Sequence, residues 1–173
     1  MTRAARLDLR SFQQELAARL ATRTAAQVES SRLSFVCAGT QWLVRLADAG
    51  EVIAVPPIAR VPLTRDWFLG LANVRGNLYS VVDFAAFTGA APVPAGASAR
   101  LLLFASRSGD LNAGLVVERV AGLRNITELA GHAPPPGAPD WYAQRWSDAD
   151  GNTWQEVDLA ALARDASFLQ VGI

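Results

Sequence analysis

Residues 70–84 read GLANVRGNLYSVVDF, and this stretch decides the expected fold. The apolar residues over 77–83 are typical of a strand buried inside a β-protein. Asn73 and Gly76 suit the backbone angles of a turn before that strand, and Gly70 can end a short helix in the left-handed conformation. Arg75 would project from the turn, where its guanidinium either stays in solvent or binds a neighbouring carboxylate with two hydrogen bonds.

The segments on either side of this motif predict mostly short strands. Upstream, we expect a hairpin over 33–46, strands over 51–54 and 58–61, and a short helix over 64–71 that begins at Thr64. Downstream, a closing helix is expected to begin after Asp158 and to cover 159–166. It follows the predicted strands over 101–105, 111–117, 120–126, 141–147 and 153–157.

This succession of strands indicates a mainly β fold made of small barrels. Gly, Ala, Pro and Ser dominate residues 89–98, which we expect to be a linker. The linker divides the β region into predicted subdomains of about 31–88 and 99–158, each long enough for a five-stranded barrel.

The N-terminal part of the chain predicts a helical extension over residues 1–30. Leu9, Phe12, Leu16 and Leu20 recur at helical spacing between polar residues, which predicts an amphipathic helix over 8–29. Asp8 is its predicted N-cap.

The composition excludes several classes of function. The chain has 173 residues and no net charge, and all 16 basic residues are Arg, so no lysine is available for a Schiff base or a phosphate-binding loop. No basic stripe indicates nucleic acid as a partner. Neither a membrane span nor a signal-peptide core is present, which indicates a cytoplasmic protein without direct membrane insertion.

Candidate catalytic and metal-binding residues are few. His132 is the one histidine, and it lies in a Gly/Pro-rich loop without a nucleophile beside it. Cys37 is the one cysteine, which excludes an intramolecular disulfide and predicts a buried, inert thiol. Residues 148–152 read DADGN, but they lack the Gly and Glu positions of a calcium-binding loop and are typical of a hairpin turn. We therefore expect no catalytic residue, no cofactor and no metal.

Three tryptophans gather near the C-terminus at Trp141, Trp146 and Trp154. They can belong to a core, or they can form a surface for a partner or a carbohydrate, since aromatic residues are enriched at interface centres. Three coplanar rings on an open face would favour a ligand- or carbohydrate-binding module, and buried rings would favour a purely structural role.

Residues 70–84 resemble the central motif of the CheW family, in which Gly-(Leu/Val)-x-Asn-Leu-Arg-Gly runs into a strand that ends Val-Val-Asp-Leu. Val74, Ser80 and Phe84 stand where Leu, Pro and Leu are usual. These replacements leave the order of the motif intact.

Two further stretches and the tail extend the resemblance. Glu51-Val52 is similar to the Glu-Ile pair of the family, and residues 114–120 (GLVVERV) resemble its Gly-Ile-Val-Val-Asp-x-Val strand. The likeness runs from residue 33 to about residue 165. The long N-terminal helix and the tail over 168–173 resemble the type IV pilus branch of the family, which serves twitching motility.

The resemblance implies two SH3-like barrels on a shared core, which act as a non-catalytic adaptor for chemotaxis or twitching motility. One barrel would bind the regulatory domain of a CheA-like histidine kinase. The groove between the barrels would take the tip of a methyl-accepting chemoreceptor and recruit this cytoplasmic protein to receptor arrays. Carried over to this chain, the partner-binding residues would be Arg75, Glu51, Gly70, Asn73, Gly76, Val120 and Leu123. Arg75 and Glu51 would make polar contacts, and Gly70, Val120 and Leu123 would line or support an apolar surface.

Overall fold

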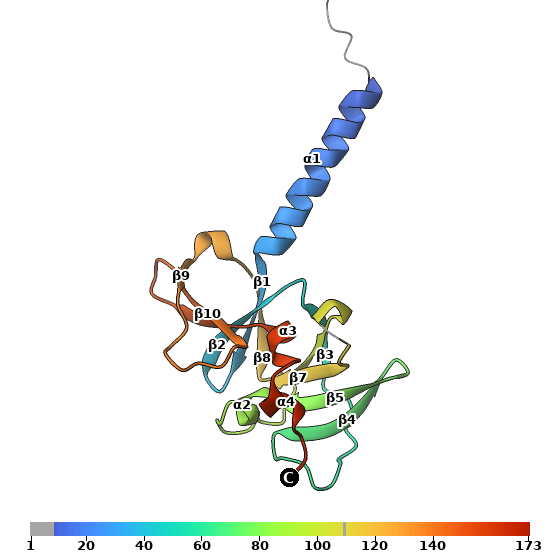
Figure 1. Ribbon diagram of the computed structural model, residues 1–173, viewed down its shortest axis with the longest axis vertical. Coiled ribbons are helices and arrows are strands. Elements are labelled where there is room, and N and C mark those ends of the chain that lie inside the picture. The colour runs from blue at the N-terminus through green and yellow to red at the C-terminus, as the bar shows by residue number, and fades with distance from the viewer. Residues whose placement is uncertain (1–8, 109) are drawn as a thin grey trace, which may run out of the picture.

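A computed structural model describes residues 9–108 and 110–173, which form two β-sheets and one long helix (Figure 1). We name the six-stranded sheet, of order β8-β1-β2-β11-β10-β9, barrel A, and the five-stranded sheet, of order β3-β6-β7-β5-β4, barrel B. The strands are β1 (Ser31–Cys37), β2 (Thr40–Arg45), β3 (Ala49–Ala54), β4 (Phe68–Val74), β5 (Asn77–Asp83), β6 (Arg100–Phe104), β7 (Ala113–Val117), β8 (Arg119–Asn125), β9 (Ala130–His132), β10 (Tyr142–Ser147) and β11 (Thr153–Val157). The helices are α1 (Leu9–Ser30), α2 (Phe84–Phe87), α3 (Leu159–Leu162) and α4 (Ala166–Leu169), with 3-10 turns η1 (Ser106–Ser108) and η2 (Ile126–Glu128). The mainly β fold is confirmed.

The chain divides differently between the barrels than its linker suggests. It forms β1 and β2 in barrel A, crosses to barrel B for β3 to β7, and returns to barrel A for β8 to β11. The predicted division into subdomains of about 31–88 and 99–158 is therefore wrong. Residues 89–98 connect α2 to β6 inside barrel B, so the Gly- and Pro-rich stretch marks a long connection and not a boundary.

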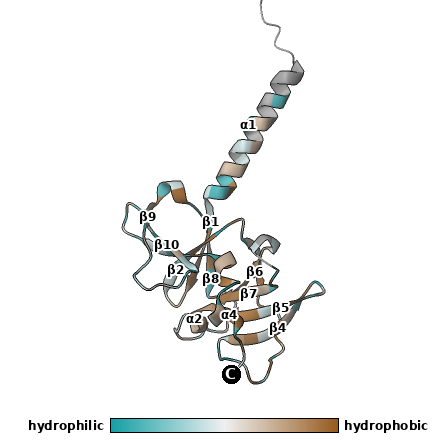
Figure 2. Ribbon diagram, viewed as in Figure 1, coloured by the Kyte–Doolittle hydropathy of each residue, from teal (hydrophilic) through white to brown (hydrophobic). Residues whose placement is uncertain are grey.

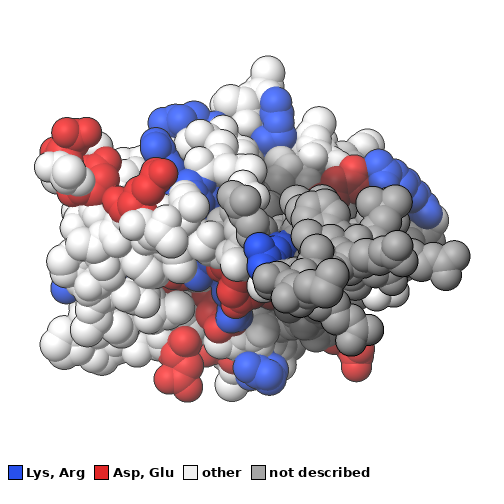
Figure 3. Space-filling view, turned by 90° about the horizontal axis from the view of Figure 1, so that it is seen from above, with Lys and Arg blue, Asp and Glu red and all other residues white. Residues whose placement is uncertain are grey.

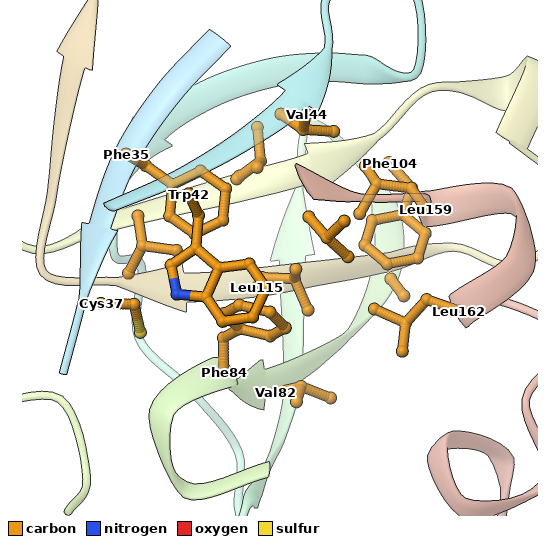
Figure 4. Close-up of a cluster of buried hydrophobic side chains, with 14 of the residues drawn as sticks. Phe35, Cys37, Trp42, Val44, Val82, Phe84, Phe104, Leu115, Leu159 and Leu162 are labelled. Atoms are coloured by element: carbon orange, nitrogen blue, oxygen red, sulfur yellow. The ribbon is translucent and has the colours of Figure 1, made fainter. Parts of the chain in front are cut away.

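The two barrels pack on one shared hydrophobic core, as expected (Figure 4). Phe35 and Trp42 enter this core from barrel A. Phe84 of α2 enters it from barrel B and packs edge-on against both rings, with centroids 5.8 Å from Phe35 and 4.9 Å from Trp42. Leu159 and Leu162 of α3 are also fully buried there. One core therefore holds both barrels together.

The predicted helix over 64–71 is wrong. Phe68–Val74 forms β4, which pairs antiparallel with β5, and Phe68, Gly70 and Ala72 alternate as its buried positions. Trp67, Phe68 and Leu71 also fit a helical spacing. Pairing with β5 instead satisfies the backbone hydrogen bonds of this segment and buries the side chain of Phe68. Tertiary pairing thus overrides the local pattern.

Gly70 has a different role from the predicted helix end. It lies inside β4 with φ of +131°, at the point where the register between β4 and β5 shifts. A Cβ atom there would lie 2.1 Å from the carbonyl oxygen of Ala59, which pairs with Leu71. Gly70 therefore allows residues 59–60 to cross closely over β4.

The remaining differences concern short elements. The predicted strand over 58–61 is reduced to the single bridge between Ala59 and Leu71. The Gly- and Pro-rich loop expected around His132 contains β9, which pairs with β10 and gives barrel A its sixth strand. The closing helix begins after Asp158 as predicted, but it ends at Leu162, and α4 follows as a separate turn capped by Asp165.

Leu9–Ser30 forms α1, which extends away from both barrels (Figure 1). Asp8, its predicted cap, lies outside the described residues. The same holds for the side chains of Leu9, Phe12, Leu16 and Leu20, so the amphipathic face stays a prediction.

The two barrels repeat one unit of structure and sequence. In each, the second strand of a hairpin pairs in parallel with another strand, β5 with β7 and β11 with β2. Gly-Asn stands at the start of that second strand, at residues 76–77 and 151–152, and an Asp at its end caps a four-residue helix, Asp83 for α2 and Asp158 for α3. The first strands follow Asp-Trp in both copies, at residues 66–67 and 140–141. Strands β8, β1, β2, β11 and β10 of barrel A therefore correspond in order to β3, β6, β7, β5 and β4 of barrel B, and β9 has no counterpart.

Candidate protein-interaction site

The tip of the β4–β5 hairpin carries the central sequence motif. Its two turn residues, Arg75 and Gly76, have φ of 52° and 88°, and a type I′ turn requires positive φ at both positions. The side-chain oxygen of Asn73 accepts a hydrogen bond of 2.9 Å from the backbone N–H of Gly76. The predicted turn is confirmed, and both Asn73 and Gly76 serve its geometry.

Arg75 and Glu51 meet in a bidentate ion pair. The Nη1 atom of Arg75 donates to Oε2 of Glu51 at 2.9 Å, and Nη2 donates to Oε1 at 2.7 Å. The Arg75 side chain is 75% exposed and that of Glu51 is 41% exposed, so water screens the pair and its net contribution to stability is small. Its effect is geometric, because two parallel hydrogen bonds fix the plane of a guanidinium that still presents donors to solvent.

The structure places the other predicted contact residues elsewhere. Gly70 is buried beneath residues 59–60 and supports the surface without reaching it. Val120 and Leu123 lie on β8 of barrel A, where Val120 packs against the shared core and Leu123 is 60% exposed. The structure thus brings Arg75, Glu51, Asn73 and Gly76 together at one end of barrel B, with Val120 and Leu123 on the other barrel.

Leu78 is a surface residue that the sequence analysis did not single out. It is the second residue of β5 and pairs with Asn73, so it lies beside the hairpin tip, and it is 59% exposed. Burial along β5 rises steadily from the exposed residues beside the turn to the buried residues before Asp83, so its position next to the predicted turn is the signal that could have identified Leu78.

The two candidate reactive side chains, His132 and Cys37, have structural roles in the fold. A hydrogen bond of 2.8 Å joins Nε2 of His132 and Oγ of Ser147, and both residues lie on strands of barrel A. Burial raises the pKa of the Cys37 thiol to about 12, with the nearby carboxylates of Asp83 and Glu118 adding to the effect. Over residues 9–108 and 110–173, no three His, Cys, Asp or Glu side chains gather where they could hold a metal ion.

The DADGN stretch forms a hairpin turn. The carboxylate of Asp148 accepts hydrogen bonds from the backbone N–H groups of Asp150 and Asn152 and from the Asn152 side chain. The Asn152 amide lowers the pKa of Asp148 because it stabilises the charged form. The carboxylate is thus engaged within its own loop.

The tryptophan cluster forms no open platform. Trp141 is 8% exposed and lies in the shared core, and Trp154 is 2% exposed. Trp146 is partly buried, and its Nε1 donates to Oε2 of Glu156 at 2.6 Å. The burial of Trp141 and Trp154 favours a structural role over a carbohydrate-binding module built on three open rings, while Trp146 and Trp154 line one hollow of barrel A.

The surface carries charges of both signs, and the described helices include no membrane span, as the composition suggests. Basic and acidic residues are interspersed on the face of the molecule shown in Figure 3. Among the helices that the structure describes, none combines the length and the apolar character needed to cross a bilayer.

Comparison with known proteins places the fold and the motif in one group. A family model described as CheW-like domain matches residues 32–167. Protein PilI of Pseudomonas aeruginosa is 29% identical over 169 residues, covering 96% of this chain and 94% of PilI. The crystal structure of scaffolding protein TtCheW from Thermoanaerobacter tengcongensis superposes with a TM-score of 0.65 at 19% identity, covering 75% of this chain and 88% of that one.

Proposed function

This chain belongs to the CheW-like domain family, and from that premise we propose that it is a non-catalytic adaptor which couples a chemoreceptor to a CheA-type histidine kinase. The similarity to PilI extends over nearly the whole chain, which favours a chemosensory system that controls type IV pili and twitching motility. The adaptor would act in the cytoplasm at receptor arrays, and it would need no cofactor. Its role would be geometric, since a rigid connector can pass a change in receptor arrangement to the kinase.

The observation that carries the proposal is the Arg75–Glu51 pair on its type I′ turn. An exposed pair contributes little to folding, so a bidentate arrangement held on a rigid hairpin favours a role in recognition. Leu78, exposed beside the turn, adds apolar area to the same surface. We assign this end of barrel B to the regulatory domain of the kinase, and the exposed edge of β8 with Val120 and Leu123 to the receptor tip.

Reversing the charge of Arg75 should weaken kinase binding strongly without unfolding the protein. We expect Arg75→Glu to weaken binding to the regulatory domain of the CheA-like kinase by about tenfold or more, because it places two carboxylates side by side at the contact. Calorimetry measures the affinity, and circular dichroism checks the fold. Arg164→Glu, which changes an exposed Arg after α3, is the matched control and should bind like the wild type.

The double variant Arg75→Glu, Glu51→Arg separates two roles of the pair. It restores the ion pair with its direction reversed, so recovered binding would mean that the pair only shapes the hairpin. Continued loss would mean that Arg75 itself contacts the kinase. No binding by the wild type would contradict the assignment of the kinase as partner.

The receptor assignment predicts a separate effect. We expect Leu123→Glu to weaken binding to a receptor-tip fragment by about tenfold, because it places a charge where an apolar side chain would be desolvated. Kinase binding should stay unchanged, since Leu123 lies on barrel A. Loss of kinase binding with retained receptor binding would reverse the two assignments.

A further inference from the structure

The repeated unit places a charged pair in barrel A where barrel B has an apolar pair. Glu156 pairs in parallel with Leu43, which pairs with Ser34 of β1. In barrel B, Val81 pairs in parallel with Gly114, which pairs with Leu103 of β6. Glu156 is thus the counterpart of Val81. Arg32 and Leu101, two residues before Ser34 and Leu103, are counterparts in the same way.

Barrel B shows that a barrel of this kind folds on an apolar interior. Val81 and Leu101 are fully buried there and form one cluster with Ala72, Leu103 and Val116. Figure 2 colours β6 and β7, two strands of this cluster, as strongly hydrophobic.

Barrel A holds a buried hydrogen-bonded group in the same place. Nε of Arg32 donates to Oε1 of Glu156 at 2.6 Å, and these side chains are only 9% and 7% exposed. The second oxygen of Glu156 accepts from Trp146, so both carboxylate oxygens are engaged. Burying an ion pair costs desolvation that well-packed apolar side chains avoid, so the stability of the barrel does not explain this choice.

Arg32 makes one contact that Leu101 cannot make. Its Nη1 atom donates to the backbone carbonyl of Glu29 at 2.7 Å, in the last turn of α1. The last carbonyls of a helix have no partner within the helix, so this hydrogen bond ties a free group of α1 to the interior of barrel A. Oγ of Ser31 closes the same turn by donating to the carbonyl of Gln27 at 2.6 Å.

The C-terminal part of α1 does not pack an apolar face against the barrels. The side chains of residues 24–29 are all exposed. The guanidinium of Arg32 therefore links Glu156, fixed in β11, to the end of a helix that extends into solvent (Figure 1).

We infer that Arg32 and Glu156 are positioning residues for α1, and that this buried pair fixes the direction in which the helix leaves barrel A. The pair makes α1 a rigid arm of the molecule. This inference concerns the arm alone and does not depend on which partners the barrels bind.

The double variant Arg32→Leu, Glu156→Val tests the inference, because it gives barrel A the apolar pair of barrel B. Nitroxide labels are attached to cysteines introduced by Ala25→Cys in α1 and Thr153→Cys in β11. Pulsed electron paramagnetic resonance then measures the distribution of distances between helix and barrel. Cys37 should take no label, since it is 1% exposed and burial raises its pKa to about 12. We expect a narrow distance distribution in the otherwise unchanged protein and a distribution about twice as broad in the double variant. The urea midpoint of the barrels should stay unchanged or rise.

Two further variants keep the outcome decisive. Arg32→Lys keeps the charge but cannot bind Glu156 and the Glu29 carbonyl with one planar fork, so its distribution should also broaden. Arg65→Leu removes an Arg that donates to the backbone carbonyl of Gln170 at 2.9 Å, and its distribution should stay narrow. A narrow distribution in the double variant would overturn the inference. A urea midpoint as low as that of Glu156→Val alone would also overturn it, because the pair would then serve the barrel.

Discussion

Phe84→Ala should lower the free energy of unfolding by about 3–5 kcal/mol, the usual cost of removing a buried aromatic ring. Phe84 is 0% exposed, and its ring contacts Phe35, Trp42 and Trp141 at centroid distances of 5.8, 4.9 and 6.2 Å. Phe84 enters the core from α2 of barrel B, whereas the three rings that it contacts belong to barrel A. The cavity would therefore open between the two barrels, where neither can close it alone.

Urea unfolding followed by tryptophan fluorescence and by circular dichroism measures this effect. Because the core is shared, both signals should move together to a lower midpoint. Leu78→Ala is the matched control in the same barrel, and it should change stability by about 0.5 kcal/mol or less because Leu78 is 59% exposed. Two separate transitions in Phe84→Ala would contradict the shared core, since one barrel would then survive without the other.

Gly70→Ala is expected to destabilise the protein by about 3 kcal/mol or more. The new methyl group would lie 2.1 Å from the carbonyl oxygen of Ala59 and 2.9 Å from its carbonyl carbon, which is backbone that cannot rotate aside. The residue would also have to keep φ of +131°, a region that L-residues rarely adopt. Residues 59–60 would then have to lift from β4 and break the bridge between Ala59 and Leu71.

Gly39→Ala separates the two causes of this loss. Gly39 has φ of +70°, and a Cβ atom there would meet nothing within 4 Å, so it carries the conformational cost without a clash. We expect it to cost about 1 kcal/mol in chemical denaturation. Equal losses in the two variants would mean that the loop over β4 yields easily and that close approach is not the role of Gly70.

The strands that the sequence predicted well are those with a clear pattern over a short range. The strand predicted over 77–83 is β5 itself, because its boundaries are marked by a turn and by a capping Asp. The helix predicted over 64–71 is wrong because the apolar residues Trp67, Phe68 and Leu71 are compatible with either a helix or a strand. Only the pairing with β5 decides between the two. Gly70 was recognised as a special backbone position, but the contact that requires it comes from Ala59, which no local pattern indicates.

The candidate site shows the same limit. The turn at Arg75 and its capacity for a bidentate contact followed from the motif, and the family resemblance pointed to Glu51 as well. The sequence alone does not indicate that these two residues bind each other, because they are 24 residues apart, with Glu51 on β3 and Arg75 in the turn between β4 and β5. The repeat between the barrels was hidden for a related reason. Its copies share a few scattered residues, and the strand registers are needed to align Arg32 with Leu101.

The path of the chain between the barrels has a consequence for synthesis on the ribosome. The β1–β2 hairpin emerges early, but its parallel partner β11 pairs Gln155 with Trp42. Roughly 110 residues must be translated in between, which takes roughly 5–20 s at ordinary elongation rates. The strands of barrel B are translated within that interval, while Phe35 and Trp42 stay uncovered by the C-terminal strands. A nascent chain of this protein thus exposes an aromatic hairpin for seconds, so chaperones that hold apolar segments during translation should associate with it at β1 and β2.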